Sequence, residues 1–87
     1  MIKSFICSII CPSGIIGGGL YISDTEIVYK TNKLTVDRKY KNLVIYKNQI
    51  CEISWKWIIF PIATIRLING EKYSFIIFNK KGFEKCL

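Results

Sequence analysis

The 87-residue sequence contains no histidine, the side chain that most often serves as a general base and as a metal ligand. Its absence excludes every catalytic arrangement that pairs a serine or cysteine with histidine. Only six acidic residues are present, and no spacing pairs two of them for acid–base catalysis. No glycine-rich phosphate-binding loop is recognisable either. The sequence therefore predicts a protein that is not an enzyme and that needs no cofactor.

The cysteines are too scattered for an ordinary zinc site. Such sites usually take their ligands from two close C-x2-C pairs, whereas here only Cys7 and Cys11 are close, and on a strand they would lie ~13 Å apart. A disulfide framework requires a secreted context, which the sequence does not clearly provide. We therefore expect no metal, and reduced thiols that pack as small hydrophobic groups. The four cysteines are Cys7, Cys11, Cys51 and Cys86.

Positive charge is the strongest compositional signal, because 13 lysines and arginines outnumber six acidic residues and give a net charge of +7. Much of it lies in or beside residues 31–42, which we expect to form a long polar loop. Such a cluster would attract phosphate or anionic lipid, each lysine contributing ~1 kcal/mol near an anionic bilayer. The alternative interpretation is a solvated loop between strands. The candidate anion- or lipid-binding residues are Lys30, Lys33, Arg38, Lys39 and Lys41.

Length and hydrophobicity indicate a single strand-rich domain over residues 1–87. Apolar residues make up 51% of the chain, which excludes an intrinsically disordered protein. Short alternating segments are separated by turn signals about every ten residues, which is typical of a small barrel or sandwich. The predicted strands cover residues 2–10, 18–23, 26–30, 43–46, 50–57, 63–68 and 72–78.

Two local signals refine this prediction. The Asn69-Gly70 pair predicts a type I′ hairpin turn, in which both central residues have positive φ. Asn79 is expected to cap a short C-terminal helix. The helix would turn three apolar residues to one side: Phe83, Cys86 and Leu87.

Residues 4–23 carry no charge and are numerous enough to span a bilayer. They also contain Pro12 and four glycines, and they lack the leucine-rich block of a signal peptide. We expect two strands joined by a turn at residues 12–14, in preference to a removed signal or a membrane anchor.

The order of these elements resembles the pleckstrin-homology (PH) superfold, and the residues are similar to those of GRAM and bacterial PH-like domains. GGLYIS at 18–23 resembles the family's "G-G-x-L-x-L-T" strand, and EIVY at 26–29 resembles the strand that follows it. LVI at 43–45 resembles the next apolar step, and IRLINGEKYSF at 65–75 resembles a later hairpin with its glycine. The resemblance implies a mostly β fold, a PH-like barrel of about seven antiparallel strands in two near-orthogonal sheets with a short C-terminal helix.

The chain departs from this family in two ways. PH domains that bind phosphoinositides carry basic residues on the first β-hairpin, but residues 11–16 are uncharged here, so no headgroup site carries over. The terminal helix is also shorter than the family's usual one. We therefore expect Phe75 and Ile77 to lie near water, Ile76 and Phe78 to be uncovered on the opposite face, and the chain to self-associate.

An aromatic run at 55–60 is a second candidate surface. At the tip of a loop its tryptophans would anchor an interface, whereas on an inward strand face they would fill the barrel. The candidate apolar anchor or interface residues are Trp55, Trp57, Phe60, Ile76 and Phe78.

These observations favour a non-enzymatic PH-like binding module that contacts protein partners or an anionic membrane surface. We expect it to be cytoplasmic and, when bound to a membrane, peripheral at the inner face. Two alternatives stay open: a basic β-barrel that binds nucleic acid, and a structural subunit that assembles as a homo-oligomer through exposed strand edges.

Overall fold

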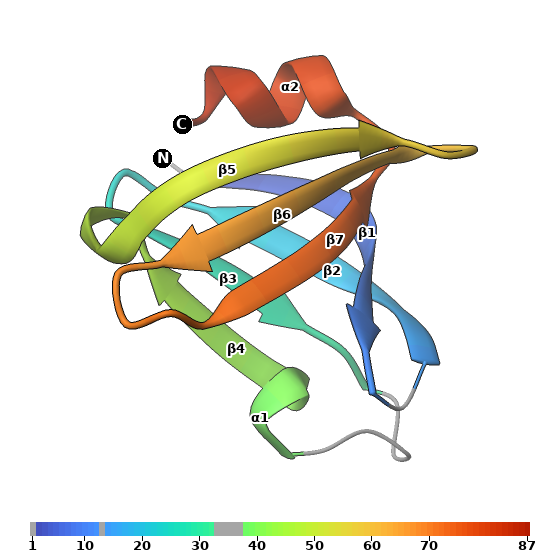
Figure 1. Cartoon of the computed structure of the whole chain (residues 1–87), viewed down its shortest axis with the longest axis horizontal. Coiled ribbons are helices and arrows are strands. Elements are labelled where there is room, and N and C mark those ends of the chain that lie inside the picture. The colour runs from blue at the N-terminus through green and yellow to red at the C-terminus, as the bar shows by residue number, and fades with distance from the viewer. Residues whose placement is uncertain (1, 13, 33–37) are drawn as a thin grey trace.

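The computed structural model of the chain describes residues 2–12, 14–32 and 38–87. Within them, seven antiparallel strands form one sheet that curls into a half-barrel, with a short C-terminal helix across one opening (Figure 1). The strands are β1 (Lys3–Cys11), β2 (Gly14–Ile22), β3 (Glu26–Lys30), β4 (Asn42–Tyr46), β5 (Ile50–Trp57), β6 (Pro61–Leu67) and β7 (Lys72–Ile77). The helical elements are α1 (Arg38–Lys41), the 3₁₀ turn η1 (Lys47–Gln49) and α2 (Lys80–Lys85).

The strand order is β4-β3-β2-β1-β7-β6-β5, so β1 joins two antiparallel meanders. β1 pairs with β2 along its whole length, from Lys3 opposite Ile22 to Cys11 opposite Gly14. The second half of β1 also pairs with β7, beginning with Cys7 opposite Ile77. β4 and β5 are left as the two edges of the sheet.

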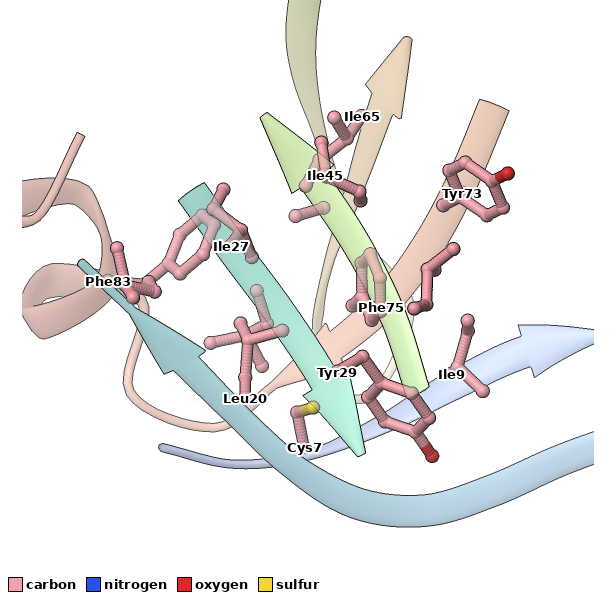
Figure 2. Close-up of a cluster of buried hydrophobic side chains, with 14 of the residues drawn as sticks. Cys7, Ile9, Leu20, Ile27, Tyr29, Ile45, Ile65, Tyr73, Phe75 and Phe83 are labelled. Atoms are coloured by element: carbon pink, nitrogen blue, oxygen red, sulfur yellow. The ribbon is translucent and has the colours of Figure 1, made fainter. Parts of the chain in front are cut away.

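Alternate side chains of the strands fill the concave side of the sheet, as the period-two pattern predicts. Figure 2 shows Tyr29 and Phe75 pointing into this interior beside Cys7 and Ile9, and their rings lie 5.7 Å apart. The Tyr29 hydroxyl donates a 2.7 Å hydrogen bond to the Ile16 carbonyl, so this buried polar group is paired. The buried side chains of β2, β3, β4, β6 and β7 include Leu20, Ile22, Ile27, Tyr29, Leu43, Ile45, Ala63, Ile65, Tyr73, Phe75 and Ile77.

Helix α2 covers one opening of the half-barrel with a single buried ring. The Asn79 side chain caps the helix by accepting a 3.0 Å hydrogen bond from the Gly82 amide, as predicted. Phe83 is 0% exposed, and it meets Phe5 and Trp55 edge to face with ring centroids 6.3 and 5.7 Å away.

The expectation that a short helix would leave Phe75 and Ile77 near water is wrong. Both residues are fully buried. One well-placed phenylalanine on a six-residue helix, Phe83, closes this opening because the sheet itself curls around its own interior. The other two residues of the predicted apolar helix face are less buried than Phe83: Cys86 is half-buried and Leu87 is exposed.

Two predicted boundaries differ from the structure by more than two residues. β2 begins at Gly14, earlier than residue 18, because Ile15 and Ile16 continue the hairpin by pairing with Ile10 and Ile9. Isoleucine favours strands, but these two residues are followed in the sequence by a glycine run. Glycine is depleted in strands, so the run hid the true start of β2. The predicted loop over 31–42 ends in α1 and the start of β4, while residues 33–37 lie outside the described part of the chain.

The hairpin between β6 and β7 is not the predicted type I′ turn. Gly70 has φ 93°, but Asn69 does not have a positive φ. The Gly70 amide donates a 3.0 Å hydrogen bond to the Leu67 carbonyl, as in three-residue loops that place glycine last, in the left-handed conformation. The Asn69 side chain favours this turn, because its oxygen accepts a 2.9 Å hydrogen bond from the backbone amide of Glu71, two residues further on.

The uncharged N-terminal segment forms strands, as predicted. β1 and β2 pair with each other and contribute four buried side chains: Cys7, Ile9, Leu20 and Ile22. Across the described residues, no helix combines the length and the apolar character needed to cross a membrane.

Candidate functional site

The structure places two of the five basic candidates beside a hollow on the outer side of β2 and β3. Lys30 ends β3 and Lys41 ends α1, and both are exposed. The Thr31 amide donates a 3.2 Å hydrogen bond to the Lys41 carbonyl, which holds the two segments together. Arg38 and Lys39 belong to α1, whereas Lys33 lies outside the described residues.

Residues of β2 form the floor of this hollow, which we call the basic hollow. Gly19 lies opposite Lys30 in the sheet, and it has no side chain to fill the space above the outward face of the strand. The Lys30 ammonium lies 5.8 Å from the centre of the Tyr21 ring, within reach of a cation–π contact. The basic hollow is lined by Gly18, Gly19, Tyr21, Lys30, Thr31, Asn32 and Lys41.

None of the described residues that line the basic hollow is acidic. An anion placed there would meet lysine ammonium groups and no opposing carboxylate. Lysine suits this role as a hydrated point charge without directional demands. The hollow can therefore hold phosphate-like groups by charge.

A second hollow, entirely apolar, lies between the β1–β2 hairpin and the turn that joins β5 to β6. Every residue that lines it is an isoleucine or a phenylalanine. We call it the apolar surface, and it consists of Ile10, Ile15, Ile62 and Ile76 from the strands and residues 58–60 from the turn. Ile59 is 78% exposed, although burial of an isoleucine side chain away from water is favourable in free energy.

The apolar candidates do not form one group. Phe60 and Ile76 line the apolar surface, and Phe78 joins them through an edge-to-face contact with Phe60 at 5.1 Å between ring centroids. Trp55 instead faces inward, half-buried against Phe83, with the Lys80 ammonium 5.0 Å from its ring centre. The interpretation of Trp55 as a barrel residue therefore fits its position.

Trp57 has the same strand parity as Trp55 but is 65% exposed. It pairs with Pro61 at the very end of the β5–β6 ladder, beyond the part of the sheet that Phe83 covers. Together with Phe78 and Pro61 it borders a neighbouring hollow whose remaining lining is polar: Asn79, Lys80, Lys81 and Glu84.

Two acidic side chains in the described part of the chain, those of Glu52 and Glu71, form structural contacts. Glu52 pairs with Arg66 across β5 and β6 at 3.4 Å, with both side chains well exposed. The Glu71 carboxylate accepts hydrogen bonds from the side-chain amide nitrogen of Asn69 and from the Tyr73 hydroxyl. Burial and that hydrogen bond raise the pKa of Tyr73 to about 12, which keeps the phenol protonated.

The four cysteines differ sharply in environment. Cys7 is buried in the core, Cys11 and Cys86 are half-buried, and Cys51 is exposed. Within the described residues, no three potential metal ligands come together.

Cys7 is expected to be the least reactive of the four thiols. It is 1% exposed, and burial raises its pKa to about 12, so almost no reactive thiolate is present near neutral pH. Because the pKa is higher in the folded chain, ionisation of Cys7 opposes folding, and its contribution to stability falls as pH rises from about 9 to about 12.

Maleimide labelling at pH 8 with peptide mass mapping checks this prediction. Cys51 should be modified first and Cys7 last, and all four thiols should react at similar rates in guanidinium chloride. Labelling of Cys7 as fast as Cys51 in the folded protein would contradict the buried position.

No protein-family model matches the chain, and no curated protein matches it either.

Proposed function

We propose that the chain is a non-enzymatic, PH-like interaction module, similar to GRAM domains, that binds anionic membrane surfaces. The basic hollow carries this proposal, because it gathers exposed lysines over a floor of glycine without any described acidic neighbour. The antiparallel meander with a C-terminal helix across one opening supports the PH-like assignment. We also propose that the two halves of the curled sheet correspond to the two near-orthogonal sheets that the family implies.

The position of the charge matters for the type of binding. The first hairpin, where phosphoinositide-binding PH domains concentrate basic residues, has none here. Five of the 13 basic residues lie instead on β3, on α1 or in the sequence between them. We therefore propose binding to anionic surface charge in general, with lysines neutralising lipid phosphates, in place of a pocket for one headgroup.

Flotation with vesicles of phosphatidylcholine and phosphatidylglycerol tests this function. Binding should be strong at low salt and much weaker at 0.15 M salt, where exposed charges are screened over ~8 Å. Replacing Lys30 and Lys41, the two lysines that line the basic hollow, with serine should weaken it by roughly 30-fold, since each lysine contributes ~1 kcal/mol near an anionic bilayer.

A matched control separates the basic hollow from net charge. Replacing Lys3 and Lys72 with serine removes the same number of charges from exposed positions away from that hollow. The control variant should bind far more tightly than the test variant. An equal loss of vesicle binding in both variants would show that binding depends on net charge alone. Tighter binding to an oligonucleotide in a mobility-shift assay than to vesicles would favour nucleic acid as the ligand.

A further inference from the structure

We infer that the apolar surface at the β5–β6 turn inserts into the interfacial layer of an anionic membrane. This inference rests on the proposed function and gives it a second, apolar component. It assigns a ligand to a group of isoleucines that lie together in one hollow, several of which are exposed to water.

The geometry brings three separate segments to one apolar region. Ile10 and Ile15 lie opposite each other beside the β1–β2 turn, and Ile62 lies opposite Ile76 across β6 and β7. Residues 58–60 project from the end of β5 beside them, with Ile58 68% and Ile59 78% exposed. Contiguous apolar surface of this kind usually marks an interaction site.

The surroundings of the apolar surface match the layer between lipid headgroups and acyl chains. Lys56 lies opposite Ile62 in the β5–β6 ladder, so a lysine stands at one border. Lys80 and Lys81 share the neighbouring hollow with Trp57 and Phe78. Tryptophan and lysine are favoured at this depth, because their apolar bodies enter the lipid while their polar ends stay hydrated.

The basic hollow lies close enough to contact the same membrane. Ile15 of the apolar surface and Gly19 of the basic hollow lie on the same outward face of β2, four residues apart in one strand. That separation is ~13 Å at the usual rise of a strand. Lysines therefore border the apolar surface on two sides, toward β3 and toward α2.

Charge distinguishes a membrane from the other occupants of such a surface. Two copies of a chain with net charge +7 repel each other, which disfavours self-association through a surface bordered by lysines. Nucleic acid would satisfy the lysines but would leave the isoleucines in water, because its contacts are mainly to phosphate and sugar. An anionic bilayer satisfies both groups at once.

Trp57 provides a direct optical test in the intact 87-residue chain. The Trp55→Phe variant leaves Trp57 as the only tryptophan, and the Trp57→Phe variant leaves Trp55 as an inward-facing control. With vesicles that contain phosphatidylglycerol, Trp57 emission should shift to shorter wavelength and should be quenched by brominated acyl chains. Trp55 emission should change much less.

A pair of matched variants tests the isoleucines. The Ile58→Ser, Ile59→Ser double variant should still bind at low salt through its lysines but should bind roughly 10- to 100-fold more weakly at 0.15 M salt. The control is Ile68→Ser, which removes an equally exposed isoleucine (65%) from the β6–β7 loop at the other end of β6. It should bind as the unmodified chain does.

The outcomes separate this inference from the proposed function. Salt-sensitive vesicle binding with unquenched Trp57 and an unaffected double variant would overturn the insertion and leave the lysine-based function standing. Equal quenching with neutral vesicles and no salt dependence would support insertion but contradict the role of the lysines. Absence of vesicle binding would overturn both, whereas a dimer that the Ile58→Ser, Ile59→Ser variant dissociates would overturn the insertion alone.

Discussion

Replacing Phe83 with alanine is expected to remove about 3–5 kcal/mol from the free energy of unfolding. The ring is fully buried and forms the only deeply buried contact of α2, packing edge to face on Phe5 and Trp55. A six-residue helix is far too short to persist by itself in water, so α2 depends on this anchor. Loss of the ring opens the interior beneath it to solvent.

Thermal denaturation followed by circular dichroism measures this effect. A loss of 3 kcal/mol should lower the Tm by at least about 12 °C in a domain of this size. Leu87→Ala is the matched control, because it removes a large apolar side chain that is exposed just after the same helix. Its effect should stay within about 0.5 kcal/mol. Equal destabilisation by both substitutions would mean that Phe83 does not hold the helix.

Adding one methyl group at Gly18 is expected to cost about 1–3 kcal/mol, while the same change at Gly17 should be neutral or stabilising. A Cβ atom at Gly18 would collide with the Lys30 carbonyl and would lie 2.8 Å from the Tyr29 hydroxyl oxygen. Neither can retreat easily, since the carbonyl belongs to the paired strand and Tyr29 is fixed in the core.

Gly17 is an internal control one residue away. A Cβ atom there would meet nothing nearer than the Ser8 hydroxyl oxygen at 3.9 Å, and the position is exposed. Urea denaturation of Gly17→Ala and Gly18→Ala compares the two directly. A Gly18→Ala protein as stable as the parent would show that β2 and β3 do not approach as closely as described.

The inward face of several strands could be predicted from the sequence because burial follows a local rule. Where apolar residues alternate with polar ones, as Ala63 and Ile65 do with Thr64 and Arg66, the side that the apolar residues share is the side that faces the core. The cap at Asn79 is equally local, since its partner Gly82 lies three residues away. Such features require no knowledge of the rest of the chain.

The two surfaces could not be predicted in the same way, because each depends on contacts between distant segments. Trp55 and Trp57 follow the same alternation, yet only Trp55 is reached by Phe83 from α2, so the two differ in burial. The basic hollow likewise exists because the sheet register sets Gly19 opposite Lys30. A run of three glycines was the sequence signal for a floor without side chains, but it does not say which lysine lies above it.

The role of β1 as the joint between the two meanders has a consequence for how the molecule is made. β2, β3 and β4 follow one another in the sheet, as do β5, β6 and β7, so each group can form from neighbouring segments. The pairing of β1 with β7 joins the first strand to the last, and such distant pairing is slow because a long loop must close first. During synthesis on the ribosome, the edge of β1 that pairs with β7 therefore stays unpaired until β7 has emerged. In this interval β1 can pair with a wrong strand.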